Sequence, residues 1–128
     1  MLTDDDWAPL RAAVPSFTDR WRAFLAQPWY ESDPSYDVAE LAKHLVGEAA
    51  AGRTAELPEF FSALDALLAG ASDELYDLAT IGLLEDVVHE ADRQGVKLTL
   101  FERAAKGSHA RKAWTTVVKF IRGEGRSP

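Results

Sequence analysis

Residues 72–95, SDELYDLATIGLLEDVVHEADRQG, decide the fold of this chain. Ser72, followed by two acidic residues, is typical of a helix N-terminus, and Gly95 is the next residue that predicts a helix end. From 75 to 88, apolar residues fall on most sides of the helix. We therefore expect a central helix that neighbouring helices cover on more than one flank. Gly82, in the middle of the segment, indicates a close crossing with another helix.

On both sides of this segment, apolar residues recur with a period close to 3.6, which predicts amphipathic helices. The clearest stripe begins at Val38 and ends at Ala49, and Gly52 ends its helix. Proline and glycine residues separate the stripes, and the expected helices cover about residues 3–14, 16–27, 38–51, 54–69, 72–94, 100–106 and 108–122. The predicted fold class is all-α, a compact bundle or array of about seven antiparallel helices around a buried central helix.

Hydroxyl side chains precede several of these helices. Thr3, Ser16, Ser72 and Ser108 each stand where a helix N-cap is expected. None of these serines lies in the strand-turn-helix setting of a hydrolase nucleophile. The alternating stretch 97–101 is too short and isolated to pair as a strand.

The composition is that of one globular domain. Of the 128 residues, 47% are apolar and 27% charged, and we expect a single domain over 1–128 with a frayed tail at 123–128. The chain has no cysteine, which excludes disulfides, thiol nucleophiles and thiolate metal sites. Charges interrupt every apolar run, so we expect no membrane span, and residues 1–6 are acidic where a secretory signal is basic. These features predict a cytoplasmic protein.

The charge is unevenly distributed along the chain. Residues 1–96 hold 19 acidic and 6 basic residues, a formal charge of −13, whereas residues 97–128 hold 2 acidic and 8 basic residues, a formal charge of +6. An acidic body repels nucleic acid and anionic membrane, and it attracts basic protein surfaces. We therefore expect a protein partner and disfavour a nucleic acid or a membrane.

The stretch from Pro28 to Asp37 is the longest predicted loop, because its prolines and turn formers do not continue a helix. Its aromatic residues are of the types enriched at interfaces, and acidic residues surround them. Two interpretations remain open: the aromatic side chains form a partner-binding surface, or they fold back over the core as a lid. The candidate partner-binding residues are Trp29, Tyr30, Glu31, Asp33 and Tyr36 in the loop, with Glu85, Asp86 and Glu90 as outlying candidates.

A metal-dependent enzyme is a competing interpretation that rests on histidines near carboxylates. Glu40 lies four residues before His44, and a second pair of carboxylates precedes His89 by three and four residues. These pairs are half of the ligand set of a dinuclear metal centre in a helical bundle. Glu40 and His44 lie outside the apolar stripe of their helix, so we interpret them as an exposed surface pair.

A nucleic-acid adaptor is a third interpretation, and it rests on the basic end of the chain. Packing of the last helix against the acidic body is the competing explanation for these charges, and Trp114 on its apolar stripe is expected in the core. The basic residues concerned are Lys106, Arg111, Lys112, Lys119, Arg122 and Arg126.

Five stretches carry a resemblance to a known group of proteins: LAKHLV (41–46), FFSAL (60–64), LLAGASDEL (67–75), GLLED (82–86) and GSHARKAW (107–114). Together they resemble a family of small all-helical bacterial proteins of uncharacterised function, over roughly residues 37–122. Members of this kind resemble the stand-alone immunity proteins encoded beside polymorphic toxins. The resemblance therefore implies a role in neutralising a toxin.

The function predicted from the sequence is that of a non-enzymatic protein-binding module. The chain is expected to be an immunity protein that neutralises a cognate bacterial toxin by occluding a basic site on it. The acidic surface speeds association, buried aromatic residues slow dissociation, and no cofactor is required.

Overall fold

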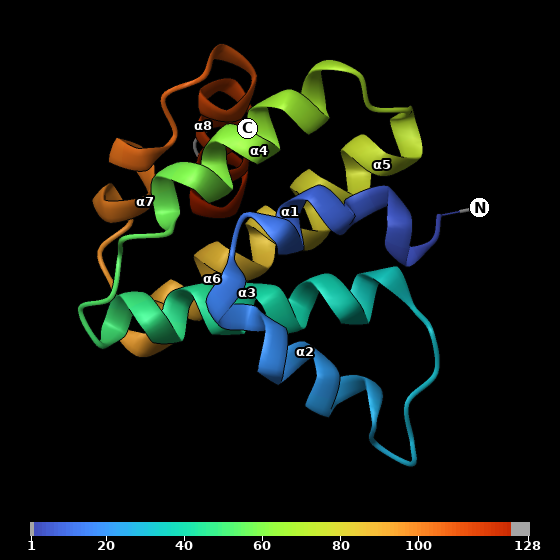
Figure 1. Cartoon of the computed structure of the whole chain (residues 1–128). Coiled ribbons are helices and arrows are strands. Elements are labelled where there is room, and N and C mark those ends of the chain that lie inside the picture. Colours follow the sequence, from blue (N-terminus) through green and yellow to red (C-terminus); the bar gives the residue numbers. More distant parts are fainter. Residues whose placement is uncertain (1, 124–128) are drawn as a thin grey trace.

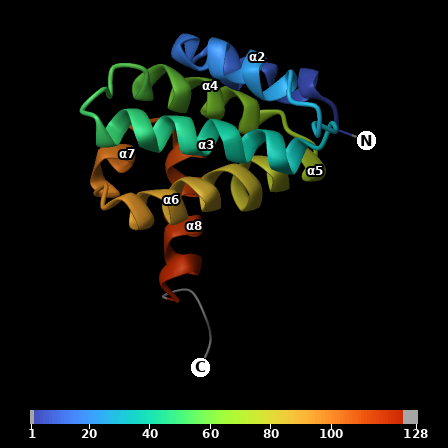
Figure 2. The same ribbon diagram turned by 90° about the horizontal axis from the view of Figure 1, so that it is seen from below.

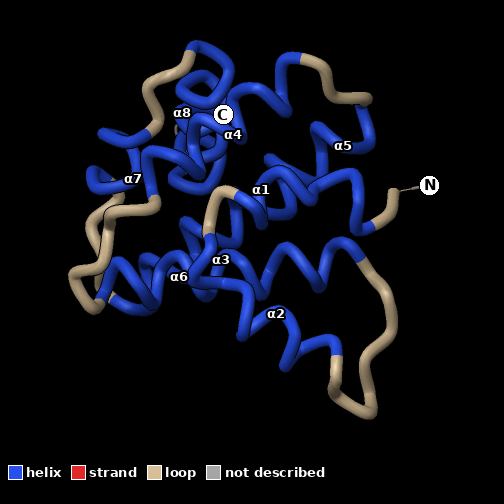
Figure 3. The backbone as a smooth tube through the Cα atoms, in the orientation of Figure 1, coloured by secondary structure: helices blue, strands red, loops and turns tan. Residues whose placement is uncertain are grey.

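The structure is a computed structural model that describes residues 2–123 (Figure 1). Every regular element in this range is helical, which confirms the all-α fold class (Figure 3). Residues 124–128 of the expected frayed tail lie outside the described residues. The elements are η1 (Asp4–Trp7), α1 (Ala8–Ala12), η2 (Pro15–Phe17), α2 (Thr18–Leu25), α3 (Pro34–Ala50), α4 (Leu57–Ala69), α5 (Asp73–Asp77), η3 (Leu78–Leu84), α6 (Glu85–Gln94), α7 (Thr99–Ala104) and α8 (Ser108–Arg122).

The predicted central helix is present as α5, η3 and α6, which follow one another without a break. Ser72 caps its N-terminus by accepting the backbone N–H of Leu75 at 3.2 Å, and Gly95 ends it with a left-handed φ of 73°. The sequence did not predict that η3 is π-helical. Within it Thr80 Oγ1 donates to the carbonyl of Tyr76 at 2.8 Å.

The η3 and α6 parts of the central helix pack against α3, and α8 crosses the central helix (Figure 2). The helices α3, α4 and the central helix alternate in direction, so α3 and the central helix run parallel to each other (Figures 1 and 2). Leu83, Leu84 and Val88 are completely buried, as a central helix requires. Tyr76 and Ile81 are not covered: they are 39% and 61% exposed. The expected cover on more than one flank is confirmed by α3 and α8, but the apolar pattern of residues 75–88 also predicted little exposed surface, and that is wrong at these two positions.

Gly82 does lie against α3, but the crossing does not require glycine. A Cβ added at Gly82 would meet Val38 Cγ2 of α3 and Leu78 Cδ1 at 3.5 Å, an ordinary van der Waals distance.

Two predicted N-caps are corrected by the structure. Ser16 lies inside η2, and its side chain contacts residues of other elements instead of the helix. Ser108 is the first residue of α8, and Gly107 stands at the N-cap position. A side chain from another helix performs the capping, because Asp65 of α4 accepts the backbone N–H of Ala110 at 2.9 Å.

The helices α4, α7 and α8 form a second part of the core around Trp114, which is 1% exposed. The indole ring meets the Phe61 ring of α4 edge-on at 6.0 Å and the Phe101 ring of α7 at 5.7 Å. The expected core position of Trp114 is confirmed.

Gly107→Ala is expected to lower the free energy of unfolding by about 1 to 2 kcal/mol. A Cβ at this position would lie 2.2 Å from Asp65 Cγ, so the carboxylate must rotate away and release the N-terminus of α8. Chemical denaturation measures the change. The matched control is Gly47→Ala in α3, where a Cβ meets nothing within 4 Å and the helix gains up to about 1 kcal/mol. A Gly107→Ala protein as stable as the wild type would contradict this assignment.

Candidate functional site

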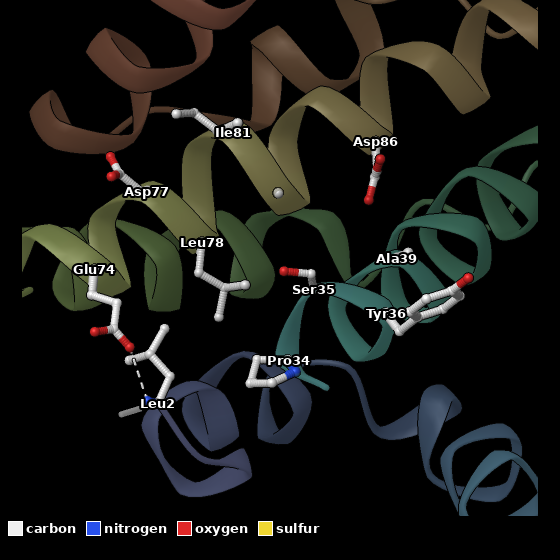
Figure 4. Close-up of a pocket in the computed structure, with 11 residues that line it drawn as sticks. Leu2, Pro34, Ser35, Tyr36, Ala39, Glu74, Asp77, Leu78, Ile81 and Asp86 are labelled. Atoms are coloured by element: carbon white, nitrogen blue, oxygen red, sulfur yellow. Dashed lines mark hydrogen bonds between the residues drawn. The ribbon is translucent and has the colours of Figure 1, made fainter. Parts of the chain in front are cut away.

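A groove lies between the N-terminal part of α3 and the central helix, and we call it the Tyr36 groove (Figure 4). Its volume is about 760 Å³. The N-terminal end of the described chain closes one side, because the backbone N–H of Leu2 donates to Glu74 Oε1 at 2.9 Å. The groove is lined by Leu2, Pro34, Ser35, Tyr36, Ala39, Glu74, Asp77, Leu78, Ile81, Gly82 and Asp86.

The floor of the Tyr36 groove is apolar and its rim is acidic. Pro34 and Leu78 lie between carboxylates placed around the edge (Figure 4). Tyr36 and Ile81 rise from the groove with 68% and 61% of their surface exposed. Three carboxylates, those of Glu74, Asp77 and Asp86, line the groove, and no lysine, arginine or histidine among the described residues does.

Asp86 is the rim carboxylate most affected by its surroundings. Burial raises the pKa of Asp86 above its usual value, with Glu85 and Glu90 acting in the same direction and His89 and Lys43 opposing them. A positive charge placed beside a partly buried carboxylate stabilises its ionised form.

The structure brings two of the predicted partner-binding residues, Tyr36 and Asp86, into this groove from distant parts of the sequence. Tyr36 is not in a loop as predicted, because α3 already begins at Pro34. Asp33 caps this helix by accepting the backbone N–H of Ser35 at 3.0 Å, and proline suits the first turn. The predicted loop is therefore shorter than expected, and Asp33 has a structural role.

Of the remaining aromatic residues of the predicted loop, one is exposed, as a partner-binding surface requires, and one folds over the core, as a lid does. Trp29 is 63% exposed, although its ring meets the Phe24 ring edge-on at 5.5 Å. Glu31 is also exposed. Tyr30 folds inward: its ring meets Phe24 at 5.3 Å, and its hydroxyl donates to Asp37 Oδ2 at 3.1 Å. Neither Trp29 nor Tyr30 lines the Tyr36 groove.

The outlying acidic candidates also separate. Glu85 lines a second groove, which the central helix shares with α8. Glu90 is paired within its own helix, with Arg93 and with the Gln94 side-chain amide at 3.1 Å.

Asp37, expected among the acidic residues around the loop aromatics, is completely buried. Its carboxyl group lies close to that of Asp4, and burial followed by the interaction with Asp4 raises the pKa of Asp37 from 3.8 to about 6. Asp33 acts in the same direction, whereas the Tyr30 hydroxyl opposes the shift. The Arg11 guanidinium is also near, and its Nη1 donates to the Asp4 carbonyl at 2.9 Å. Asp4 Oδ1 and Asp37 Oδ1 are buried without a hydrogen-bond partner among the described residues, and a proton shared by the two carboxyl groups would supply one.

Asp37→Asn is expected to raise the free energy of unfolding at pH 8 by on the order of 2 kcal/mol and to raise it by about half as much at pH 5, which lies between the unfolded and folded pKa values. The folded state binds the Asp37 proton more tightly than the unfolded state, because its pKa rises from 3.8 to about 6. The stabilising contribution is complete below the unfolded pKa and is lost as the pH rises through the folded pKa. Asparagine stays neutral at every pH, so the variant keeps this stabilising contribution at pH 8. Urea denaturation at the two pH values measures the difference.

Glu31→Gln is the control for this experiment, since it removes an exposed carboxylate from the same region. It is expected to leave the pH dependence of stability unchanged. An Asp37→Asn protein whose stability differs from the wild type by the same amount at both pH values would contradict the assignment.

A polar cluster around His44 was not predicted from the sequence. His44 is buried, not exposed as predicted, and its ring lies 5.4 Å from the Phe17 ring. Its Nε2 atom is 2.7 Å from Ser16 Oγ, and Glu48 Oε1 lies 3.7 Å from the same nitrogen. Ser16 also donates through its hydroxyl and its backbone N–H to the carboxylate of Glu56. The predicted partner Glu40 instead pairs with Arg20 at 2.9 Å.

The donors and acceptors in this cluster indicate a structural role for it and not a catalytic one. A carboxylate only accepts hydrogen bonds, so Ser16 Oγ donates its one proton to Glu56 and accepts the Nε2–H of His44. His44 is then a donor toward this hydroxyl and not the base that activates it. Burial lowers the pKa of His44 below its usual value, which favours the neutral ring. The cluster ties η2 to α3 and to the segment before α4.

The residues behind the metal-enzyme and nucleic-acid interpretations lie apart from the Tyr36 groove, with the exception of Asp86. Among residues 2–123, no three histidine, aspartate or glutamate side chains form a group that could hold a metal ion. In the last helix, Arg122 binds Asp92 of α6 with two hydrogen bonds of 2.8 and 3.0 Å, and Arg111 Nε donates to the Ala105 carbonyl at 2.8 Å. Part of the basic end is therefore used in packing against the rest of the chain.

Comparison with known proteins places the chain in a family. The model of the family described as Domain of unknown function (DUF7674) matches residues 7–115. No curated protein and no solved structure matches the chain. None of the described helices has the length and hydropathy needed to cross a membrane.

Proposed function

The chain belongs to this family of a domain of unknown function, and we propose that it is a non-enzymatic protein-binding module. Its Tyr36 groove receives a basic amphipathic helix of a partner protein. The observation that carries this proposal is the combination of an apolar floor, two exposed anchors and a rim whose described residues include three carboxylates and no basic residue.

The apolar part of the groove supports a helix as the occupant. A helix places apolar side chains at i, i+3, i+4 and i+7, and these fill a groove of this kind while the opposite face stays in water. Tyr36 and Ile81 then become buried on binding. Large side chains that change from exposed to buried are the usual source of binding energy at interfaces.

The acidic rim supports a basic partner. Lysine or arginine residues beside the apolar stripe of the partner helix reach Glu74, Asp77 and Asp86. A cation beside Asp86 offsets the effect of burial, which raises the pKa of that carboxyl group. The net charge of −7 adds long-range attraction and speeds association at low salt.

The finer proposal is that the partner is a bacterial toxin and that the chain is its immunity protein. The resemblance to immunity proteins in residues 37–122 and the acidic surface support this role. A toxin that acts on an anionic substrate has a basic site, and an acidic protein bound there occludes it. Trp29 and Glu31, exposed on the loop before α3, offer a second contact for a large partner.

Co-expression tests this proposal. The product of the neighbouring gene is expected to be basic, toxic when expressed alone, harmless when expressed with this chain, and retained by it on purification. A variant with a blocked Tyr36 groove is expected to lose both retention and protection. If the neighbouring product is harmless, or if the blocked variant still protects, the immunity role through this groove is wrong.

A further inference from the structure

A second groove lies on the other side of Ile81, and we call it the Phe120 groove. It has a volume of about 500 Å³ and is formed by the central helix and α8. Its apolar surface includes Tyr76, Ile81, Val117 and Phe120. Phe120 is 52% exposed and Ile81 is 61% exposed, so two large apolar side chains stand at its edges.

Acidic residues line the Phe120 groove on the side of the central helix, and basic residues lie beside it on α8. Asp77 and Glu85 line it on the side of the central helix. On the side of α8, Thr116 lines it, and the exposed residues Lys112 and Lys119 lie four residues before and three residues after this threonine. Residues at these spacings are neighbours on a helix surface. Neither lysine forms an ion pair with another described residue.

We propose that the Phe120 groove is a self-association surface, through which two copies of this chain form a symmetric dimer. In a two-fold arrangement each copy presents the same patch, so the patch must be complementary to itself. The acidic wall of one copy then faces the basic wall of the other, and Ile81 and Phe120 of each copy enter the groove of its partner.

Charge complementarity selects a second copy as the occupant of this groove. The Tyr36 groove has carboxylates on its rim and fits a basic partner. The Phe120 groove is lined by Asp77 and Glu85 on one side and flanked on α8 by Lys112 and Lys119, an arrangement that suits an identical surface turned by a half-rotation. The two surfaces meet only at Asp77 and Ile81, so the dimer leaves Tyr36 and Ala39 uncovered. The inference does not require the proposed function, but both surfaces use Ile81, so the dimer and a basic partner compete for that side chain.

A charge exchange across the groove tests the dimer. One variant carries Glu85→Lys, and the other carries Lys112→Glu and Lys119→Glu. The double variant places acidic residues on both sides of the groove, whereas Glu85→Lys places a lysine opposite Lys112 and Lys119 while Asp77 remains. Each variant dimer is expected to dissociate at least about 10-fold more readily than that of the wild type. Mixed in equal amounts, the two variants bring opposite charges together at both contacts. Sedimentation velocity from micromolar to submillimolar concentration is expected to show a dimer of the wild type and of the mixture.

Two further variants separate this surface from the Tyr36 groove. Phe120→Arg is expected to be monomeric, and Ala39→Arg, which blocks only the Tyr36 groove, is expected to remain dimeric. Circular dichroism shows that each variant is folded. A wild-type chain that stays monomeric at submillimolar concentration would overturn the proposal. So would a mixture of charge variants that does not dimerise, or an Ala39→Arg protein that is monomeric.

Discussion

Ala39→Arg is expected to weaken binding of the basic partner about 100-fold or more. Ala39 lies in α3 and lines the Tyr36 groove beside Tyr36. An arginine at this position fills the groove with its own side chain and pairs with the rim carboxylates, so the partner loses both the apolar floor and the charges that attract it. Arginine is a strong helix former, and α3 is expected to remain intact. Isothermal titration calorimetry with the purified partner measures the loss.

The matched control is Ala50→Arg, the same substitution at the exposed C-terminal end of the same helix. It changes the net charge equally and is remote from both grooves, so it is expected to alter affinity less than about 3-fold through long-range electrostatics alone. Equal losses for the two variants would mean that net charge, and not the Tyr36 groove, governs binding.

Trp114→Ala is expected to lower the free energy of unfolding by about 4 kcal/mol. The indole side chain is 1% exposed and joins α4, α7 and α8 through its contacts with Phe61 and Phe101. Its removal leaves a cavity at the junction of three helices, which the surrounding rings fill only in part. The total stability of a domain of this size is about 5 to 15 kcal/mol, so the variant loses a large share of it. Urea denaturation measures the change.

Trp29→Ala is the control for this prediction. It makes the same chemical change at a tryptophan that is 63% exposed, and it is expected to cost less than about 1 kcal/mol. Similar losses for the two tryptophan variants would show that Trp114 does not hold the three helices together.

The helices were predictable because their apolar stripes and end signals agree. Ser72 and Gly95 stand at the two ends of the central helix in both the prediction and the structure. The π-helical geometry of η3 has no comparable signal in the sequence. Hydrogen bonds that span one residue more than in an α-helix do not disturb an apolar pattern that already surrounds the helix. Caps supplied from a distance were also hidden: Asp65 lies 45 residues before the Ala110 N–H that it accepts.

The start of α3 had a local signal that was misinterpreted. Asp33 followed by Pro34 is a helix beginning, with a capping side chain and a proline in the first turn. Interpreted as turn formers, these residues extended the loop and placed Tyr36 in it. The structure places Tyr36 in the first turn of α3, where it lines the edge of the Tyr36 groove.

The candidate site itself was only partly predictable. Tyr36 and Asp86 were singled out for separate reasons, and only the tertiary fold shows that they line one groove. Ile81 belongs to the stretch 75–88, where apolar residues on most sides of the helix predicted little exposed surface. The residue is exposed since α3 and α8 pass on either side of it. A contiguous apolar patch that the fold leaves uncovered, and not one exposed side chain, indicates an interface.

Binding of a basic amphipathic helix in the Tyr36 groove can be tested by nuclear magnetic resonance with two designed peptides. One is a helical peptide of leucine and lysine, and the other has glutamate in place of every lysine. On titration with the leucine–lysine peptide, we expect saturable shifts of the backbone amides of Tyr36, Ala39, Ile81 and Asp86, and none with the leucine–glutamate peptide. Equal binding of both peptides, or saturable shifts confined to other residues, would contradict the proposed role of the groove.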